Sequence, residues 1–131
     1  MARAVSTHLM FDGVAEQAMN FYVSLFAGSK ITQINKYGPG EPGKEGTIKW
    51  ASFKLVNHDL ICIDSPAKHD FTFTPSISIF VTCEDEAELN KAFEQLSAGG
   101  QVFMPLDNYG FSSRFGWVSD RFGVSWQLNL E

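Results

Sequence analysis

The strand pattern at the end of the chain sets the strongest limit on the fold. Trp117 and Val118 begin a hairpin, residues 120–123 form its turn, and residues 124–130 form its second strand. Two sets of side chains alternate along this second strand: Trp126, Leu128 and Leu130 on one face, and Ser125, Gln127 and Asn129 on the other. Such a strand fits a curved sheet whose convex, apolar face packs on helices and whose concave, polar face lines a site.

The first half of the chain predicts a strand, a helix and three further strands. Residues 5–11 alternate as a strand, which Asp12-Gly13 end. The next segment carries an apolar stripe at helical spacing and ends at Gly28: Ala15, Ala18, Met19, Tyr22 and Phe26. Residues 31–37 follow as a strand, and residues 38–43 are a glycine- and proline-rich loop. Residues 47–56 and 60–63 form a hairpin that turns at Asn57-His58, and residues 64–75 are a connector.

The second half of the chain repeats this order. Residues 76–81 alternate as a strand, and Asp85 with Glu88 forms a capping box before a second helix. That helix has its own apolar stripe and stops at glycines: Leu89, Ala92, Phe93 and Leu96, then Gly99-Gly100. Three short strands then run to the end. The spacing of Tyr22, Leu25 and Gly28 recurs in Phe93, Leu96 and Gly99, so the βαβββ order indicates a tandem duplication.

Three blocks of sequence, in the same order, resemble one protein family. The closing block is the run from Asp120 to Gln127, DRFGVSWQ. The opening and middle blocks are Phe11-Asp12-Gly13, Ala15-Glu16-Gln17-Ala18, Phe21-Tyr22, Leu25-Phe26, Ser76-Ile77-Ser78, Val81, Cys83-Glu84, Leu96 and Gly99-Gly100. This pattern resembles the PhnB-like family, also called the 3-demethylubiquinone-9 3-methyltransferase family, of the vicinal oxygen chelate (glyoxalase/bleomycin-resistance/dioxygenase) superfamily.

The resemblance implies a fold and an organisation. We expect an α+β protein in which tandem βαβββ modules form a curved mixed sheet, the vicinal oxygen chelate or glyoxalase-like fold. One domain would span residues 1–131, with module one at about 1–66 and module two at about 67–131. The concave side is the expected small-molecule site, and exposed sheet edges favour a homodimer.

Composition restricts the classes of partner and compartment. Charged residues make up 19% of the chain and the net charge is −5, with the basic residues scattered, so we expect no nucleic-acid partner. No apolar run is long enough to span a membrane, and the N-terminus lacks the apolar core of a signal peptide. Cys62 and Cys83 fit buried free thiols in a cytoplasmic protein, and His58 and His69 fall in exposed connections.

The alternation of the strands predicts which polar side chains face the concave side. Leu9 and Phe11 would face the first helix, which sends His8 and Met10 inward, and Ile77 and Ile79 would face the second helix, which sends Ser76 and Ser78 inward. Metal-using relatives carry ligands at four such positions, which here would be His8, Ile61, Ser76 and Gln127. A catalytic Zn²⁺ or Fe²⁺ needs about three His or carboxylate ligands, so we expect no obligatory metal or other cofactor. If a metal is bound, His8 and Gln127 are its expected ligands. Without a metal, both side chains would be polar lining of the pocket. The remaining alternative is that His8 faces solvent.

Aromatic residues and one loop complete the candidate ligand site. Trp126 should be core by parity, while Trp50 and Trp117 have equal claims to lining the cavity or packing beneath it. Residues 107–114 form a polar and aromatic loop in which Tyr109 and Arg114 are candidates for contact with an anionic ligand, the alternative being a solvated loop.

Three functions remain open at this point. The first is binding of a small, partly apolar molecule without an obligatory metal, the second is metal-dependent isomerase, lyase or dioxygenase chemistry, and the third is sequestration of a drug or toxin. Methyl transfer from S-adenosylmethionine is not expected, because the chain lacks the glycine-rich turn after a first parallel strand that such enzymes use.

Overall fold

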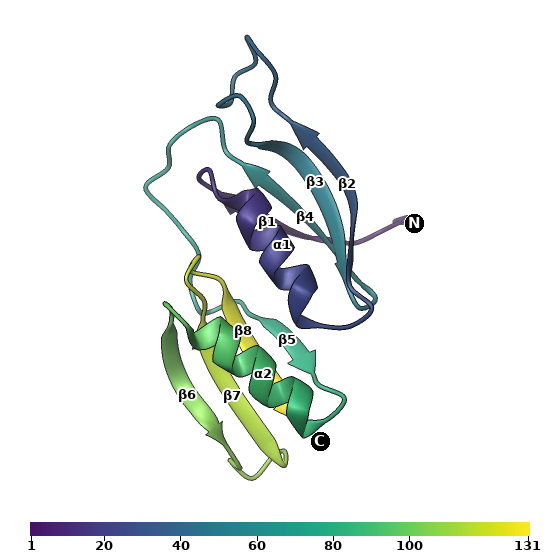
Figure 1. Cartoon of the computed structure of the whole chain (residues 1–131), viewed down its shortest axis with the longest axis vertical. Helices are drawn as coiled ribbons and strands as arrows, with labels where there is room; N and C mark the ends of the chain where they lie inside the picture. Colours follow the sequence, from purple (N-terminus) through teal and green to yellow (C-terminus); the bar gives the residue numbers. More distant parts are fainter. The chain divides into compact units, whose positions relative to one another are not determined.

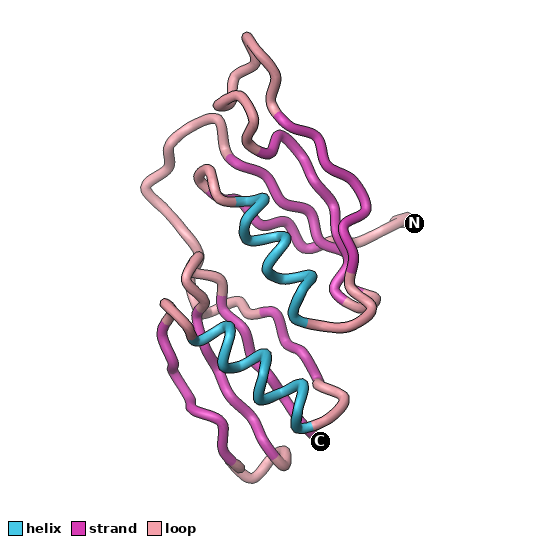
Figure 2. Tube along the Cα trace, in the orientation of Figure 1, coloured by secondary structure: helices cyan, strands magenta, loops and turns pink.

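The same five elements occur twice in the computed structural model, which describes residues 1–131. The chain divides into module one, Met1–His69, and module two, Asp70–Glu131. Module one contains β1 (Thr7–Phe11), α1 (Ala15–Leu25), β2 (Lys30–Lys36), β3 (Ile48–Leu55) and β4 (His58–Asp64). Module two contains β5 (Ile79–Thr82), α2 (Glu86–Ser97), β6 (Gln101–Asp107), β7 (Arg114–Ser119) and β8 (Ser125–Leu130). In each module the helix lies across one face of its sheet (Figures 1 and 2).

The two sheets have one topology. The strand order is β1-β4-β3-β2 in module one and β5-β8-β7-β6 in module two. The first strand of each module pairs in parallel with the last, and the other pairs are antiparallel. These features confirm the predicted α+β fold of tandem βαβββ modules. The hydrogen-bonded strands form two four-stranded mixed sheets, one per module, where the sequence led us to expect one continuous sheet.

Each core lies between a helix and one face of its own sheet. The predicted helical stripes are buried: Ala15, Ala18, Met19, Tyr22 and Phe26 in module one, and Leu89, Ala92 and Leu96 in module two. Trp126 and Leu128 of β8 are fully buried in module two, as the alternation of the last strand predicts. Neither helix is long and apolar enough to cross a membrane.

A buried carboxylate joins three elements of module one. Asp64, at the end of β4, accepts hydrogen bonds at Oδ1 from the amides of Gly13 (2.7 Å) and Ala15 (3.0 Å), and at Oδ2 from the amide of Ile48 (2.9 Å). The N-cap residue of α1, Val14, has no side-chain acceptor of its own. Asp64, although it belongs to β4, therefore accepts a hydrogen bond from a first-turn amide of α1.

The second helix is capped locally, as its sequence predicts. Asp85 Oδ1 accepts from the amide of Glu88 at 2.8 Å. The reciprocal bond differs by one residue from a standard capping box, because Glu88 Oε1 accepts from the amide of Glu84 at 2.9 Å. Two donors at the start of α2 are satisfied in this way.

Two connections differ from the sequence-based expectation. The β3–β4 hairpin turns at Val56-Asn57, and His58 begins β4, where its Nε2 lies 2.9 Å from Thr7 Oγ1. Val56 has a φ of +58°, a left-handed conformation that is costly for a β-branched residue. The strand β5 begins only at Ile79, so the prediction that Ile77 faces the second helix is wrong, and Ile77 is 72% exposed.

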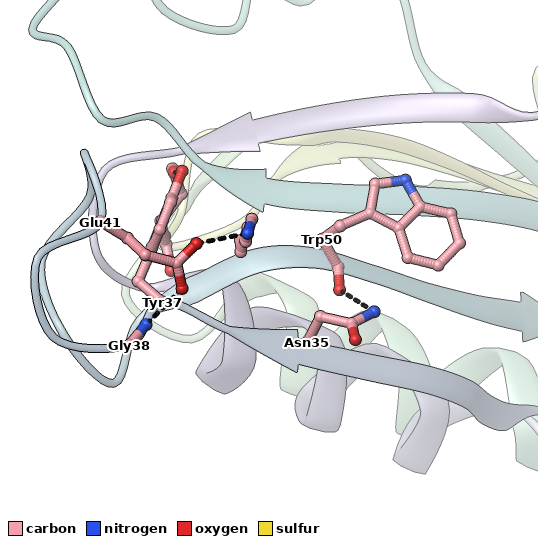
Figure 3. Close-up of polar contacts among 7 residues, drawn as sticks. Asn35, Tyr37, Gly38, Glu41 and Trp50 are labelled. Carbon is pink, nitrogen blue, oxygen red and sulfur yellow. Dashed lines mark hydrogen bonds and ion pairs between the residues drawn. The ribbon is translucent and has the colours of Figure 1, made fainter.

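The loop between β2 and β3 is fixed at both ends (Figure 3). Glu41 accepts a hydrogen bond from the Gly38 amide at 2.7 Å and pairs with Lys49 of β3. Tyr37 donates from its hydroxyl to the carbonyl oxygen of Asp64 at 3.0 Å. A Cβ on Gly43 would lie 2.2 Å from Cε2 of the Tyr37 ring, so glycine is required for this close approach.

Candidate functional site

A hydrogen-bonded polar network lies on the helix-free face of module two, by which we mean the side of its sheet opposite α2. Trp117 Nε1 donates to Ser125 Oγ at 2.8 Å, and Ser125 Oγ lies 2.6 Å from Ser78 Oγ. Gln127 Nε2 donates to Ser78 Oγ at 3.2 Å. Ser78 comes just before β5, Ser125 and Gln127 from β8, and Trp117 from β7. Three of these four, Ser78, Trp117 and Gln127, are residues that the sequence placed in the site.

Aromatic side chains surround this network on the same face. Phe103 lies 4.9 Å from Trp117 between ring centroids, and Phe80 lies 6.2 Å from Phe115. Phe111 and Tyr109, in the loop before β7, both make edge contacts with Phe115, at 4.9 Å and 6.2 Å. Phe80 and Phe111 are 56% and 64% exposed. Tyr109 is therefore held beside this face, through Phe115 and a hydrogen bond from its hydroxyl to the Pro105 carbonyl oxygen (2.6 Å).

Arg114 does not belong to this set. It begins β7 opposite Leu130, whose parity is that of the buried Trp126 and Leu128, so it lies on the side of α2. Its Nε is 3.9 Å from Glu86 Oε1 at the start of α2, too long for a hydrogen bond, and that nitrogen is buried without a partner. Ser76 is also apart from the network, because it lies outside β5 and its Oγ is 2.7 Å from Thr74 Oγ1.

The helix-free face of module one holds the remaining candidates. Leu9 and Phe11 are buried against α1, as predicted, and His8 and Met10 alternate with them on the other side of β1. His8 pairs with Ile61 of β4, and Ile61 pairs with Ser52 of β3. His8 is exposed in this position and no hydrogen bond joins it to another polar side chain. The polar contacts of β3 on this face join Ser52 to Thr32 and Lys54 to Asp59, and they do not include His8.

Trp50 and Trp117 occupy equivalent positions in the two modules. The matching ladders, each on the helix side, run Leu9–Cys62–Ala51 in module one and Ile79–Trp126–Val118 in module two. Trp50 directly precedes Ala51, and Trp117 directly precedes Val118. Trp50 makes no indole hydrogen bond in the structure, and its backbone carbonyl accepts from Asn35 Nδ2 at 3.4 Å while the ring extends away from Asn35 (Figure 3).

The same register corrects the set of four equivalent inward positions. His8 precedes Leu9 as Ser78 precedes Ile79, so Ser78, not Ser76, matches His8. Ile63 follows Cys62 as Gln127 follows Trp126, so Ile63, not Ile61, matches Gln127. The four equivalent positions are therefore His8, Ile63, Ser78 and Gln127. The expected hairpin turn at Asn57-His58 lies instead at residues 56–57, which displaces the equivalence of β4 with β8.

Comparison with known proteins places this arrangement in a family. Residues 3–129 match the family described as 3-demethylubiquinone-9 3-methyltransferase. The chain belongs to this family. It is similar to a putative 3-demethylubiquinone-9 3-methyltransferase, PhnB protein, from Bacillus cereus, with 50% identity and a TM-score of 0.95 over 98% of this chain and 100% of that one.

Two further solved structures are similar to this member of the 3-demethylubiquinone-9 3-methyltransferase family. A protein from Pseudomonas aeruginosa is 28% identical with a TM-score of 0.87, over 99% of this chain and 98% of that one. A glyoxalase-related enzyme from Fulvimarina pelagi is 14% identical with a TM-score of 0.64, over 99% of this chain and 89% of that one. The latter likeness shows the fold alone, which is glyoxalase-like.

The donor atoms of this family member do not fit a divalent metal. Of the four equivalent inward positions, only His8 is a good ligand, while Ser78 and Gln127 are weak neutral donors and Ile63 has no donor. The structure contains no group of three or more His, Cys, Asp or Glu side chains arranged to hold an ion.

Neither thiol of this family member is activated as a nucleophile. Burial raises the pKa of Cys62 to about 12, with a smaller contribution from Asp64. Burial also raises the pKa of Cys83 to about 12, followed by the charges of Glu88 and Asp85. Both thiols are free, and both are protonated near neutral pH.

Proposed function

We propose that this protein binds a small, partly apolar molecule on the helix-free face of module two, without an obligatory metal. The observation that carries the proposal is the network of Trp117, Ser125, Ser78 and Gln127 within a border of aromatic rings. A few placed polar groups among aromatic side chains are the usual lining of a small-molecule site. On module one, we propose that His8, Met10 and Trp50 contact a ligand at the helix-free face of that module's own sheet.

The methyl transfer in the family's description does not carry over to this chain as an activity. Binding S-adenosylmethionine in the common way needs a glycine-rich turn between a parallel strand and a helix. Here the turn from β1 to α1 contains one glycine, Gly13, and the turn from β5 to α2 contains none. Neither turn can cradle the cofactor in that manner.

Two alternatives use the same fold. Metal-dependent isomerase, lyase or dioxygenase chemistry would need ligands that His8, Ile63, Ser78 and Gln127 do not supply, and we do not favour it. Sequestration of a drug or toxin needs only a binding face, so it is a physiological use of the proposed binding. The aromatic border therefore supports sequestration as well as it supports binding for another purpose.

A compound screen tests the proposal. We expect a library of small aromatic compounds to contain members that raise the Tm of the wild-type protein, and we expect Trp117→Leu to lose these shifts. Ile34→Ala, an exposed position on β2 of module one, is the matched control and should retain them. A library without a single stabilising compound, or equal shifts in wild type and Trp117→Leu, would contradict the proposed site.

We further propose that the protein is a homodimer and that it works in the cytoplasm. The edge strands β2 and β6 are protected by register shifts, and β6 also by Pro105. The edge strands β1 and β5 have no charged residue, proline or register shift. Two unpaired buried thiols suit a reducing compartment. Sedimentation at micromolar protein should give a dimer, and a monomer at every concentration would contradict the first proposal.

A further inference from the structure

The direction of each hydrogen bond in the network can be assigned from its chemistry. The Trp117 indole nitrogen can only donate, so Ser125 Oγ accepts at 2.8 Å. Ser125 is 2% exposed, and the other polar atom beside its hydroxyl is Ser78 Oγ at 2.6 Å. A buried hydroxyl proton left without an acceptor is costly. Ser125 therefore donates to Ser78.

Ser78 is then the end of a chain of donors. Its oxygen accepts from Ser125 and from Gln127 Nε2, which uses both of its lone pairs. Its remaining capacity is to donate its own proton, and the two donors upstream polarise that O–H group. The hydroxyl of Ser78 therefore suits an acceptor oxygen.

The strands of module two place no positive charge on the helix-free face. Among the four strands of module two, Arg114 is the only Lys or Arg, and it lies on the side of α2. A carboxylate placed on the helix-free face would lose water without meeting a cation, which is unfavourable. A neutral carbonyl oxygen loses less hydration free energy when it moves from water to this face, and it accepts the same hydrogen bond. Around it, Phe80, Phe103 and Trp117 offer apolar surface to a flat molecule.

We infer that module two selects an uncharged, planar molecule whose carbonyl-type oxygen accepts a hydrogen bond from Ser78. This inference rests on the proposed binding function and adds the class of ligand to it. It assigns Ser125 and Trp117 a positioning role, because they fix the direction in which the Ser78 proton points.

Three probes with one ring system test the inference: acetylnaphthalene, naphthalene and naphthoate. They offer a neutral acceptor, no acceptor and a charged acceptor. We expect acetylnaphthalene to bind the wild type most tightly. Ser78→Ala should weaken acetylnaphthalene by about 3- to 10-fold and leave naphthalene unchanged, since one neutral hydrogen bond is lost. Ser76→Ala, which lies outside the network, is the matched control and should change neither.

A spectroscopic readout separates a lost hydrogen bond from a general change of the site. The carbonyl stretching frequency of bound acetylnaphthalene should fall in the wild type and return toward its free value in Ser78→Ala. Equal binding of naphthalene and acetylnaphthalene, or tightest binding of naphthoate, overturns the inference while the binding function stands. Failure of all three probes to bind, in a protein that also has no hit in the compound screen, overturns both.

Discussion

Trp126 Nε1 donates a hydrogen bond to Asp120 Oδ2 at 2.9 Å, and both residues are buried. The other carboxylate oxygen of Asp120 accepts from the amides of Phe122 (2.8 Å) and Val124 (3.0 Å), which shapes the turn between β7 and β8. The core of module two and its last turn are thus joined by one carboxylate. Removal of either side chain breaks a hydrogen bond between two buried groups, which is destabilising.

The two faces of β8 should differ in their contribution to stability. Trp126→Ala should lower the free energy of unfolding by about 3–5 kcal/mol, because it leaves a large cavity and removes the indole donor to Asp120. Gln127→Ala should cost much less, because Gln127 lies on the helix-free face and water can replace its amide. Chemical denaturation of both variants provides the comparison. Equal losses would show that the face assignment of β8 is wrong.

The β3–β4 turn should be open to stabilisation. Val56 holds a φ of +58°, and glycine adopts this conformation without the steric cost that a β-branched residue pays. Val56→Gly should raise the stability by up to about 1 kcal/mol, after the entropy cost of glycine in the unfolded chain is subtracted. Asn57→Gly is the neighbouring control, since Asn57 has no positive φ, and it should not stabilise. A lower Tm in Val56→Gly than in the wild type would contradict the claim that Val56 is strained.

The loop between β2 and β3 should depend on the absence of a side chain at position 43. Gly43→Ala would place a methyl group 2.2 Å from the Tyr37 ring and displace the ring from its hydrogen bond with the Asp64 carbonyl. We expect a lower Tm in Gly43→Ala and a smaller decrease in Tyr37→Phe, which removes the hydroxyl alone. A decrease that is larger in Tyr37→Phe would mean that the hydrogen bond, and not the close packing, determines the conformation of the loop.

Stability should fall at alkaline pH because of the two cysteines. The pKa of each thiol rises from an ordinary value of 9.0 to about 12 on folding. A raised pKa means that the folded state keeps the proton longer, so the stabilisation is complete below pH 9 and is lost between pH 9 and about 12. Cys62→Ala should reduce the slope of stability against pH in this window. An unchanged slope in Cys62→Ala and in Cys83→Ala would contradict the raised pKa values.

Local patterns in the sequence predicted most of the fold, and long-range contacts account for what they missed. The alternation of β8 placed Trp126 in the core and Gln127 opposite it, because a strand has a period of two wherever it lies. The Asp85 cap depends on residues three apart, so it was visible in the sequence. Asp64 as an acceptor for α1 was not, because its partners lie about fifty residues away.

The candidate site was predicted less completely for a related reason. A one-residue change in where a strand or turn begins moves a side chain to the other face. Arg114 was expected in a loop but begins β7 on the side of α2. Ile61 was chosen for a different reason: the register was displaced by two residues, which keeps the face but selects Ile61 where Ile63 is equivalent. Ser125 was placed on the correct face. Its hydrogen bond to Trp117 joins the neighbouring strands β8 and β7, and no short sequence pattern predicts such a bond. The equivalence of Trp50 and Trp117 emerged only from the paired registers.

The most direct test of the proposed site is the chemical shift of the Trp117 indole N–H during titration with acetylnaphthalene. The protein has three tryptophans, so three indole resonances can be assigned by single substitutions. We predict that the Trp117 resonance shifts with saturation, together with the amides of β7 and β8, while the Trp126 indole, buried on the other face and bonded to Asp120, does not. Saturable shifts confined to module one, with Trp117 unmoved, would contradict the account.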